Sequence, residues 1–188
     1  MCLAPVVFAL LAYYVPALGL RPADHTNYGT LVQPQRPAPD AAALPLATVD
    51  GQPFELSSLH GKWILLTADS SACPESCVKK LFILRNSHAS QGKNVERLTR
   101  VWFLLDDAPI PDQVAEAYKG TNMLRADPEK LAAFLAPQAS AAEREAALKA
   151  PMWIIDPLGN LMMQFPADAD PISVRNDISK LIRNSRIG

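Results

Sequence analysis

Short blocks of apolar residues alternate with polar and turn-forming residues along the chain from Leu46 onward. Three blocks, at 63–67, 100–105 and 152–155, are almost continuously apolar, which is typical of strands inside a sheet that is covered on both faces. Between and after them, apolar residues recur near helical spacing, or alanine and charged residues predominate. Helices are therefore predicted over 78–90, 111–118, 128–135, 140–148 and 171–182.

Shorter blocks complete the pattern. Residues 46–49 and 54–56 indicate two strands joined at an Asp-Gly turn, 122–125 a further short strand, and 161–165 the partner of 152–155 in a hairpin. Strand, helix and strand are followed by helices, a hairpin and a terminal helix. That order predicts an α/β domain with a mixed central sheet flanked by helices.

The first 20 residues differ in kind, because Cys2 to Leu20 contains no Asp, Glu, Lys or Arg. A helix of that length spans roughly 28 Å, close to the hydrocarbon core of a bilayer, so residues 1–20 are predicted to form a single transmembrane anchor. A cleaved signal peptide is the competing interpretation, although no basic region precedes the run and no clear cleavage site follows it. Lipidation of Cys2 is a third alternative. Because basic residues that would orient the helix are lacking, we expect the natural start to lie upstream.

Proline dominates residues 21–45, which have little periodic apolar signal. This composition indicates a semi-extended spacer that holds a domain away from a membrane. The chain is thus predicted to divide into an anchor over 1–20, a proline-rich linker over 21–45 and one domain over 46–188, which is long enough for a packed core.

The amino-acid composition excludes several classes of protein. The 188 residues are 49% hydrophobic and 20% charged, with a formal net charge of −1. A disordered polar chain and a strongly basic nucleic-acid binder are therefore excluded, and we expect no nucleic-acid partner. Three cysteines are too few for a small disulfide-stapled scaffold.

Cys73 and Cys77 lie between a predicted buried strand and a predicted helix. Pro74 suits the first helical turn, which places Cys73 at the helix N-terminus and Cys77 one turn further along the same face. The helix dipole favours a thiolate there, so Cys73 is predicted to be the more acidic and more exposed thiol. Two such sulfurs can close as a disulfide or provide two soft ligands for Cu(I). Two ordinary buried cysteines are the alternative, and a zinc site lacks further Cys or His ligands.

This stretch resembles the thioredoxin superfamily and, within it, the Sco/SenC-type proteins of cytochrome c oxidase assembly. The resemblance covers about residues 46–186 and rests on four motifs: Gly61-Lys62-Trp63 before an apolar strand, Cys73-Pro-x-x-Cys77, a strand ending in Asp106-Asp107, and Ile155-Asp156-Pro157-x-Gly159.

The resemblance implies a thioredoxin-like fold in which Cys73 and Cys77 are redox-active and can hold Cu(I). The implied partner is the copper-site subunit of cytochrome oxidase or another periplasmic thiol protein. The implied location is the bacterial inner membrane, with a single pass over residues 2–20 and the domain in the periplasm.

Two departures from the family affect the expected site. Sco-type proteins hold copper with the two cysteines and a distant histidine, but the matching neighbourhood, Leu148-Lys149-Ala150-Pro151, has none. Val78 stands where the family often has proline. Pro151 instead resembles the cis-proline that faces the active thiols in thioredoxins, and a simple proline at the start of a strand is an equal alternative. The missing histidine argues against tight Cu(II) binding and leaves Cu(I) transfer or thiol reduction open.

Other polar residues are given structural interpretations. His25, His60 and His88 are expected to be solvated surface residues. The basic residues of 79–100 are expected to form a solvated helix face, with docking to an acidic partner or to anionic headgroups as the alternative. Asp106-Asp107 is expected to cap a strand end, with tuning of a nearby thiol or binding of a partner as the alternatives.

Three functions follow from these observations. The leading hypothesis is a membrane-anchored assembly factor for cytochrome c oxidase, acting by thiol–disulfide exchange through Cys73 and Cys77 and able to transfer Cu(I). The second is a general membrane-tethered thiol–disulfide oxidoreductase, which Pro151 favours. The third is a redox-inactive scaffold of the same fold.

Overall fold

The computed structural model describes residues 3–4, 6–8 and 27–187. Within these ranges no helix is long and apolar enough to cross a membrane. The anchor predicted over 1–20 falls largely outside the described residues, as does the part of the predicted linker that precedes Asn27.

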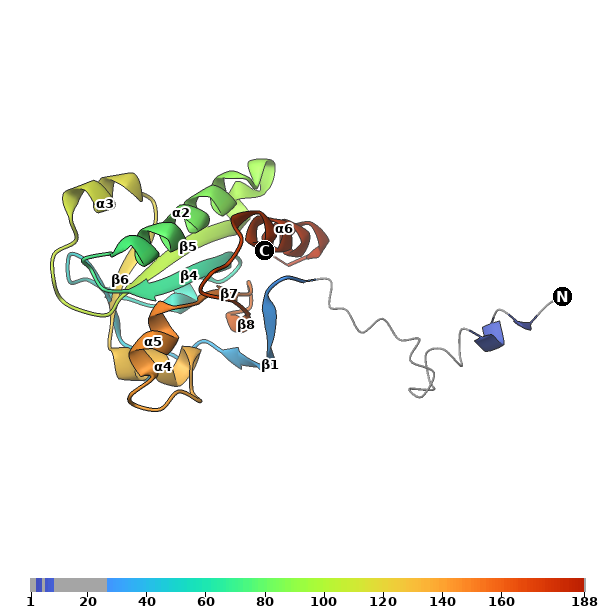
Figure 1. The fold of residues 1–188 in the computed structure, drawn as a ribbon, viewed down its shortest axis with the longest axis horizontal. Helices are drawn as coiled ribbons and strands as arrows, with labels where there is room; N and C mark the ends of the chain where they lie inside the picture. Colours follow the sequence, from blue (N-terminus) through green and yellow to red (C-terminus); the bar gives the residue numbers. More distant parts are fainter. Residues whose placement is uncertain (1–2, 5, 9–26, 188) are drawn as a thin grey trace.

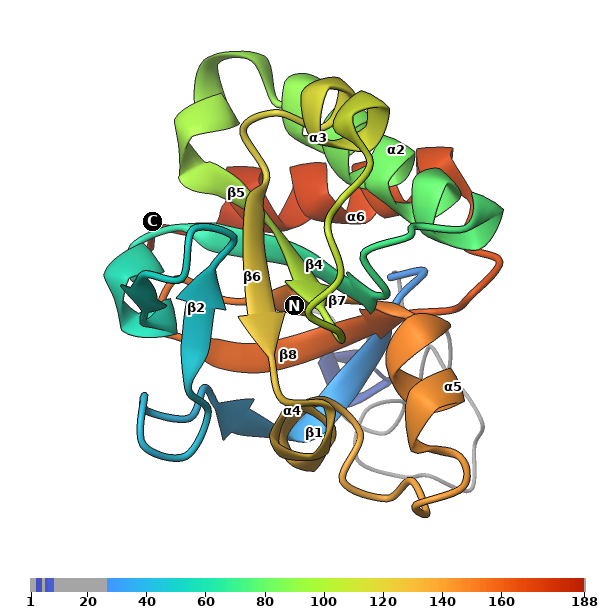
Figure 2. The same ribbon diagram turned by 90° about the vertical axis from the view of Figure 1, so that its left-hand side faces the viewer.

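An eight-stranded sheet runs through the described part of the chain in the order β1-β8-β7-β4-β5-β6-β2-β3 (Figures 1 and 2). β4 pairs in parallel with β5, and β5 with β6, while all other neighbours are antiparallel. The predicted mixed sheet is therefore confirmed. Its strands are β1 (Thr30–Pro37), β2 (Leu46–Thr48), β3 (Pro53–Phe54), β4 (Trp63–Asp69), β5 (Leu98–Leu104), β6 (Asn122–Ala126), β7 (Met152–Ile155) and β8 (Asn160–Phe165).

Helices cover both faces of this sheet, as Figure 2 shows. One face carries α2 (Glu75–Ala89), α3 (Asp112–Ala117) and α6 (Pro171–Asn184), and the other carries α4 (Pro128–Leu135) and α5 (Arg144–Lys149). Two short 3₁₀ helices, η2 (Leu56–Leu59) and η3 (Gly92–Arg97), precede β4 and β5.

The two faces have separate cores because successive residues of β4 and β5 point to opposite sides. Leu65 and Trp102 belong to the core beneath α2 and α6, whereas Ile64, Leu66 and Phe103 belong to the core beneath α4. All five side chains are buried. Burial from both sides explains why these strands appear as continuous apolar runs in the sequence.

Local signals set the helix ends. Asp127 and Asp170 each precede a proline, and their carboxylates accept the N–H groups of Lys130 at 3.0 Å and Ser173 at 2.8 Å. The bounds predicted for α4 and β7 are those found in the structure.

The linker predicted over 21–45 is corrected by the structure, because residues 30–37 form the edge strand β1. The backbone just before this strand is fastened to α6. The buried carboxylate of Asp177 accepts the N–H of Tyr28 at 2.7 Å and the N–H of Gly29 at 2.9 Å. These partners are distant in the sequence, so the local pattern of prolines gave no sign of the strand.

Candidate functional site

The two cysteines lie between the carboxyl end of β4 and the amino end of α2, as predicted. Cys73 and Cys77 form a disulfide, and their Cα atoms are 5.0 Å apart. Pro74 is the N-cap residue of α2 and therefore stands one position before the first helical turn. The disulfide thus lies beyond the carboxyl ends of the parallel strands β4 and β5.

Cys73 is held in an unusual backbone conformation. Its φ of 45° makes it the one non-glycine residue with a positive φ within the described ranges. A non-glycine residue in this left-handed region costs on the order of 1–3 kcal/mol and persists only where its surroundings fix it. Cys73 is 5% exposed and Cys77 0%, so Cys73 is the more accessible of the two, as predicted, by a small margin.

Asp106 fixes the cysteine loop from the β5 side. Its carboxylate accepts the N–H of Ser71 at 3.1 and 3.2 Å and the N–H of Ala108 at 3.3 Å. Burial opposes ionisation, but the hydrogen bonds from Ser71 and Ala108 and the charge of Arg125 outweigh it, so the pKa of Asp106 lies below its ordinary value. Arg125 of β6 also donates to the Asp106 carbonyl oxygen at 2.7 Å. Asp106 is therefore an ionised cap of the loop that carries Cys73.

Asp69 and Lys80 form a buried ion pair on the opposite side of the loop. The Lys80 Nζ lies 2.9 Å from the Asp69 Oδ2, and the two side chains are 4% and 1% exposed. Nζ also donates to the carbonyl oxygens of Ala68, at 3.2 Å, and of Lys149. Burial lowers the pKa of Lys80, and hydrogen bonding to Asp69 opposes that shift. Because Asp69 Oδ1 accepts the N–H of Ser70 at 2.9 Å, the pair also holds the first residue of the loop.

The sequence interpretation of Lys80 was wrong, since this residue was expected on a solvated basic face. Arg100, from the same stretch, is buried as well. The spacing of Cys77, Lys80, Leu81 and Leu84 could have revealed the error, because residues three, four and seven positions after Cys77 share its face of the helix. A lysine inside that buried stripe requires an internal partner.

Pro151 immediately precedes β7, which pairs with β4. Within the described residues the single cis peptide bond is Gln33–Pro34, so the resemblance of Pro151 to a cis-proline is not borne out. The alternative, a proline at the start of a strand, fits the structure. Pro151 nevertheless lies two residues after Lys149, whose carbonyl oxygen binds the Lys80 ammonium beside the disulfide helix.

The described histidines lie away from the cysteine pair. His60 follows η2 near the start of β4, and His88 is in the last turn of α2. Burial, followed by the charge of Arg100, lowers the pKa of His88. His25 is outside the described residues. Where the chain is described, no cluster of three or more His, Cys, Asp or Glu side chains could hold a metal ion. The reduced cysteines therefore offer two soft sulfur ligands without a third, a set that suits Cu(I) better than Cu(II).

Comparison with known proteins places the fold. The model of one protein family, described as "Transmembrane-like, thioredoxin-like, C-terminal domain", matches residues 63–185. A sequence search against curated proteins finds no match.

Three solved structures illustrate the similarity. Apo Sco1 of Thermus thermophilus is 20% identical, with a TM-score of 0.57 over 85% of this chain and 99% of its own. Copper-bound ScoI of Bradyrhizobium japonicum is 16% identical, with a TM-score of 0.52 over 77% and 98%. A thiol:disulfide interchange protein of Chlorobium tepidum is 19% identical, with a TM-score of 0.58 over 80% and 98%.

These similarities confirm the thioredoxin-like fold and agree with the resemblance to Sco-type proteins at the level of fold. Within this fold, the cysteine pair lies at the start of α2.

Proposed function

The chain belongs to the family of transmembrane-like, thioredoxin-like C-terminal domains, and on that premise we propose that it exchanges thiols and disulfides with a partner protein through Cys73 and Cys77. The observation that carries the proposal is the disulfide between these residues at the N-terminus of α2. A thiolate at that position is stabilised by the free N–H groups and the dipole of the helix.

The exchange proceeds in two steps. With the pair reduced, the Cys73 thiolate attacks one sulfur of a target disulfide, forms a mixed disulfide and releases the other target sulfur as a thiolate. The Cys77 thiolate then attacks the Cys73 sulfur, which closes the internal disulfide and releases the second target thiolate. Two electrons pass from the pair to the target, and a dithiol donor must reduce the pair again.

Cys73 is the attacking residue in this scheme because it is the more exposed sulfur and lies at the helix terminus. Cys77, fully buried on the helix, can reach the mixed disulfide from within the protein. The loop held by Asp69 and Asp106 keeps the two sulfurs in register through the cycle.

We assign the role to assembly of cytochrome c oxidase, with a disulfide of its copper-site subunit as the target and residues 2–20 as an anchor in the bacterial inner membrane. Support comes from the Sco-type resemblance of the motifs and from the charge-free N-terminal run. A general membrane-tethered oxidoreductase acting on other periplasmic thiol proteins is the second candidate, and the absence of a third metal ligand in the described chain favours it.

Cu(I) is a cargo that the reduced pair could carry. The relatives solved with copper bound support this idea, and two thiolates are sufficient for linear coordination of Cu(I). Copper would travel as a substrate, so the exchange steps do not depend on it.

A trapping experiment tests the exchange. In the full chain carrying Cys2→Ser, Cys77→Ser should accumulate a mixed disulfide with a target peptide, whereas Cys73→Ser should form none, as measured by intact mass. Equal trapping by both variants would contradict the assignment of Cys73, and trapping by neither would leave the redox-inactive scaffold.

Titration of the reduced chain with Cu(I) against a chromophoric chelator tests the cargo. One equivalent that requires both cysteines supports copper transfer. Intact thiol exchange without copper binding would favour the general oxidoreductase.

A further inference from the structure

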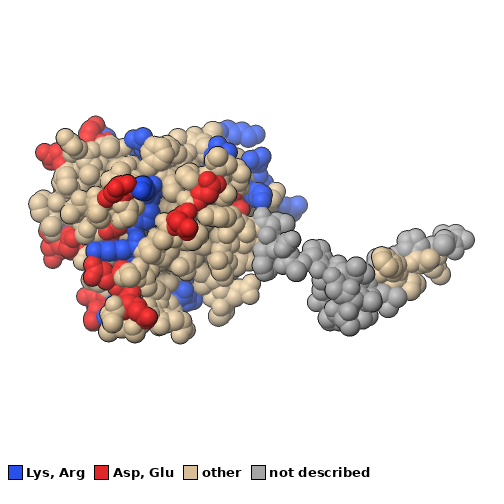
Figure 3. All heavy atoms as spheres, viewed as in Figure 1, with Lys and Arg blue, Asp and Glu red and all other residues tan. Residues whose placement is uncertain are grey.

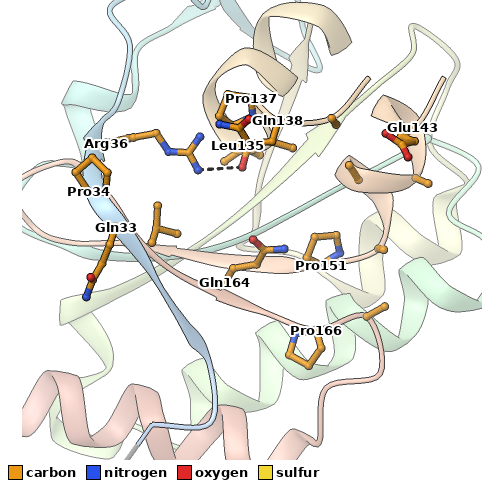
Figure 4. A pocket seen from close by; sticks show the side chains of 17 residues that line it. Gln33, Pro34, Arg36, Leu135, Pro137, Gln138, Glu143, Pro151, Gln164 and Pro166 are labelled. Carbon is orange, nitrogen blue, oxygen red and sulfur yellow. Dashed lines mark hydrogen bonds between the residues drawn. The ribbon is translucent and has the colours of Figure 1, made fainter. Parts of the chain in front are cut away.

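A hollow of about 730 Å³ opens between β1, the end of β8 and the segment that contains α4 and α5 (Figure 4). Its volume lies within the range of sites that bind small molecules or short peptide segments. Alanine and proline supply most of its lining, which is mainly apolar. The Gln164 amide projects into the space, and Gln138 lies at its rim (Figure 4).

One end of this hollow lies just before β7, next to the contact between Lys149 and Lys80 of the helix that carries Cys77. Ala150 and Pro151 line it, and the carbonyl of the preceding Lys149 is bound by the Lys80 ammonium. Ala167 lines both this hollow and a second, apolar one along α2, where Val78 and Phe82 are exposed. The two hollows therefore adjoin at Ala167, two residues after the end of β8.

Arg36 marks the other end. Its guanidinium extends from β1 toward the α4 end, where Nη2 donates to the Leu135 carbonyl oxygen at 3.2 Å. Nη1 is buried and has no hydrogen-bond partner, and no described carboxylate lies within 4.0 Å of the group. Glu143, the one acidic residue that lines the hollow, is on the opposite wall (Figure 4). A half-buried cation with an unused donor favours an anionic ligand.

We propose that this hollow binds an extended segment of the client polypeptide, with an acidic side chain paired to Arg36 and the client cysteine at Cys73. The proposal rests on the thiol exchange proposed above and names the class of substrate for it. The side-chain amides of Gln138 and Gln164 can form hydrogen bonds with a peptide backbone. A purely apolar ligand would leave these amides without a partner.

The dimensions of the site agree with a peptide. Arg36 is paired with Leu161 of β8, and β8 ends at Phe165, which belongs to the same hydrophobic cluster as Cys73 and Cys77. Four residues of strand separate these points, or about 13 Å at ~3.3 Å per residue. An extended segment of about five residues covers that length, so the acidic residue belongs roughly five to seven residues from the client cysteine.

The proposed preference for an acidic peptide depends on Arg36 alone. On the face of the molecule seen in Figure 3, acidic and basic side chains are interspersed, so no broad field of one sign is expected to attract an acidic client. The half-buried guanidinium of Arg36 alone should therefore determine the preference for an acidic client segment.

The test compares two twelve-residue peptides, each with one cysteine held as a mixed disulfide with a chromophoric aromatic thiol. One carries a glutamate six residues from the cysteine, and the other carries a glutamine there. The reduced full-length chain attacks the peptide sulfur through Cys73 and releases the coloured thiolate, and Cys77 then releases the peptide thiol. A small aromatic disulfide without peptide measures the reactivity of the thiols alone.

The second-order rate constant of the unaltered chain should be about tenfold higher with the glutamate peptide than with the glutamine peptide. Arg36→Gln should abolish this preference while the rate with the small disulfide stays unchanged. Arg36→Lys should retain part of it, because the charge remains. Arg175→Gln, which removes an exposed arginine from α6, is the matched control and should leave the preference intact. Raising the salt concentration should weaken the preference.

The outcomes separate the two proposals. A preference that survives Arg36→Gln, or no preference in a chain that reacts normally with the small disulfide, overturns the peptide site and leaves thiol exchange standing. Failure to react with the small disulfide overturns the exchange itself and the site with it.

Discussion

The cysteine loop is held on its two sides by carboxylates that achieve the same result by different physical means. On the β4 side, Asp69 is fully buried and is neutralised by the ammonium of Lys80 at 2.9 Å. On the β5 side, Asp106 is only half-buried and is satisfied mainly by backbone N–H groups. One support is therefore an internal ion pair, and the other is a surface-facing cap.

The difference determines how each support fails. Removal of Lys80 would leave an uncompensated charge inside the protein, which is strongly destabilising. Loss of the Asp106 charge would leave N–H groups that water can reach, so the penalty is small. We expect the buried side to govern stability and the exposed side to govern only the local position of the loop.

The largest effect is expected from Lys80→Met, which should lower the free energy of unfolding by about 3–5 kcal/mol because Asp69 is left buried and charged. Urea unfolding followed by circular dichroism measures it. The double variant Asp69→Leu/Lys80→Met should recover most of the loss, since it removes both charges. A double variant as unstable as Lys80→Met would show that the unpaired charge of Asp69 is not the cause of the loss of stability.

Cys73→Ser/Cys77→Ser tests whether the loop depends on its covalent link. Closing so short a loop stabilises the folded state by about 2 kcal/mol through the entropy of the unfolded chain, and that amount should be lost. Comparison of the oxidised and reduced unaltered chain by urea unfolding provides the control and should give a similar difference. A loss comparable to that of Lys80→Met would show that the disulfide, rather than the ion pair, is the main support.

Asp106→Asn should reduce the free energy of unfolding by about 1 kcal/mol at neutral pH, because hydrogen bonds to a charged acceptor become neutral ones. The pKa of Asp106 is lowered on folding, so its contribution is fully present above the ordinary value of 3.8 and is lost as the pH falls through the lowered value. The difference between the variant and the unaltered chain should therefore disappear in acid. A difference that grows in acid would have the wrong sign for this mechanism.

The smallest effect is expected at the exposed ion pair of Arg144 and Glu129, which are 2.8 Å apart with side chains 30% and 80% exposed. Arg144→Ala should change the free energy of unfolding by about 0.5 kcal/mol or less, since solvent already screens the pair. Unfolding in low and high salt measures it. A change near that of Lys80→Met would remove the distinction between buried and exposed charges on which the comparison depends.

Much of the fold follows from local sequence patterns. The buried strands β4, β5 and β7 are continuous apolar runs, and α4 begins at an Asp-Pro signal that caps its first turn. The position of the cysteine pair also follows from its place between such a strand and a helix. These features depend on residues close together in the chain, where periodicity and capping act directly.

The features that sequence analysis missed depend on distant contacts. β1 pairs with β8, whose residues lie more than 100 positions later, and its prolines conceal the strand. Lys80 has the composition of a surface residue, and only the placement of Asp69 and Lys149 around it makes burial possible. The role of Asp106 in the cysteine loop likewise requires β4 and β5 to be neighbours, which their separate patterns do not reveal.

The attachment of Tyr28 and Gly29 to Asp177 has a mechanical consequence. A pull on the chain from its N-terminal side reaches the domain first at these two hydrogen bonds, and only afterwards at the ladder between β1 and β8. The hydrogen bonds to Asp177 therefore transmit the force to α6 before the edge strand β1 separates from β8.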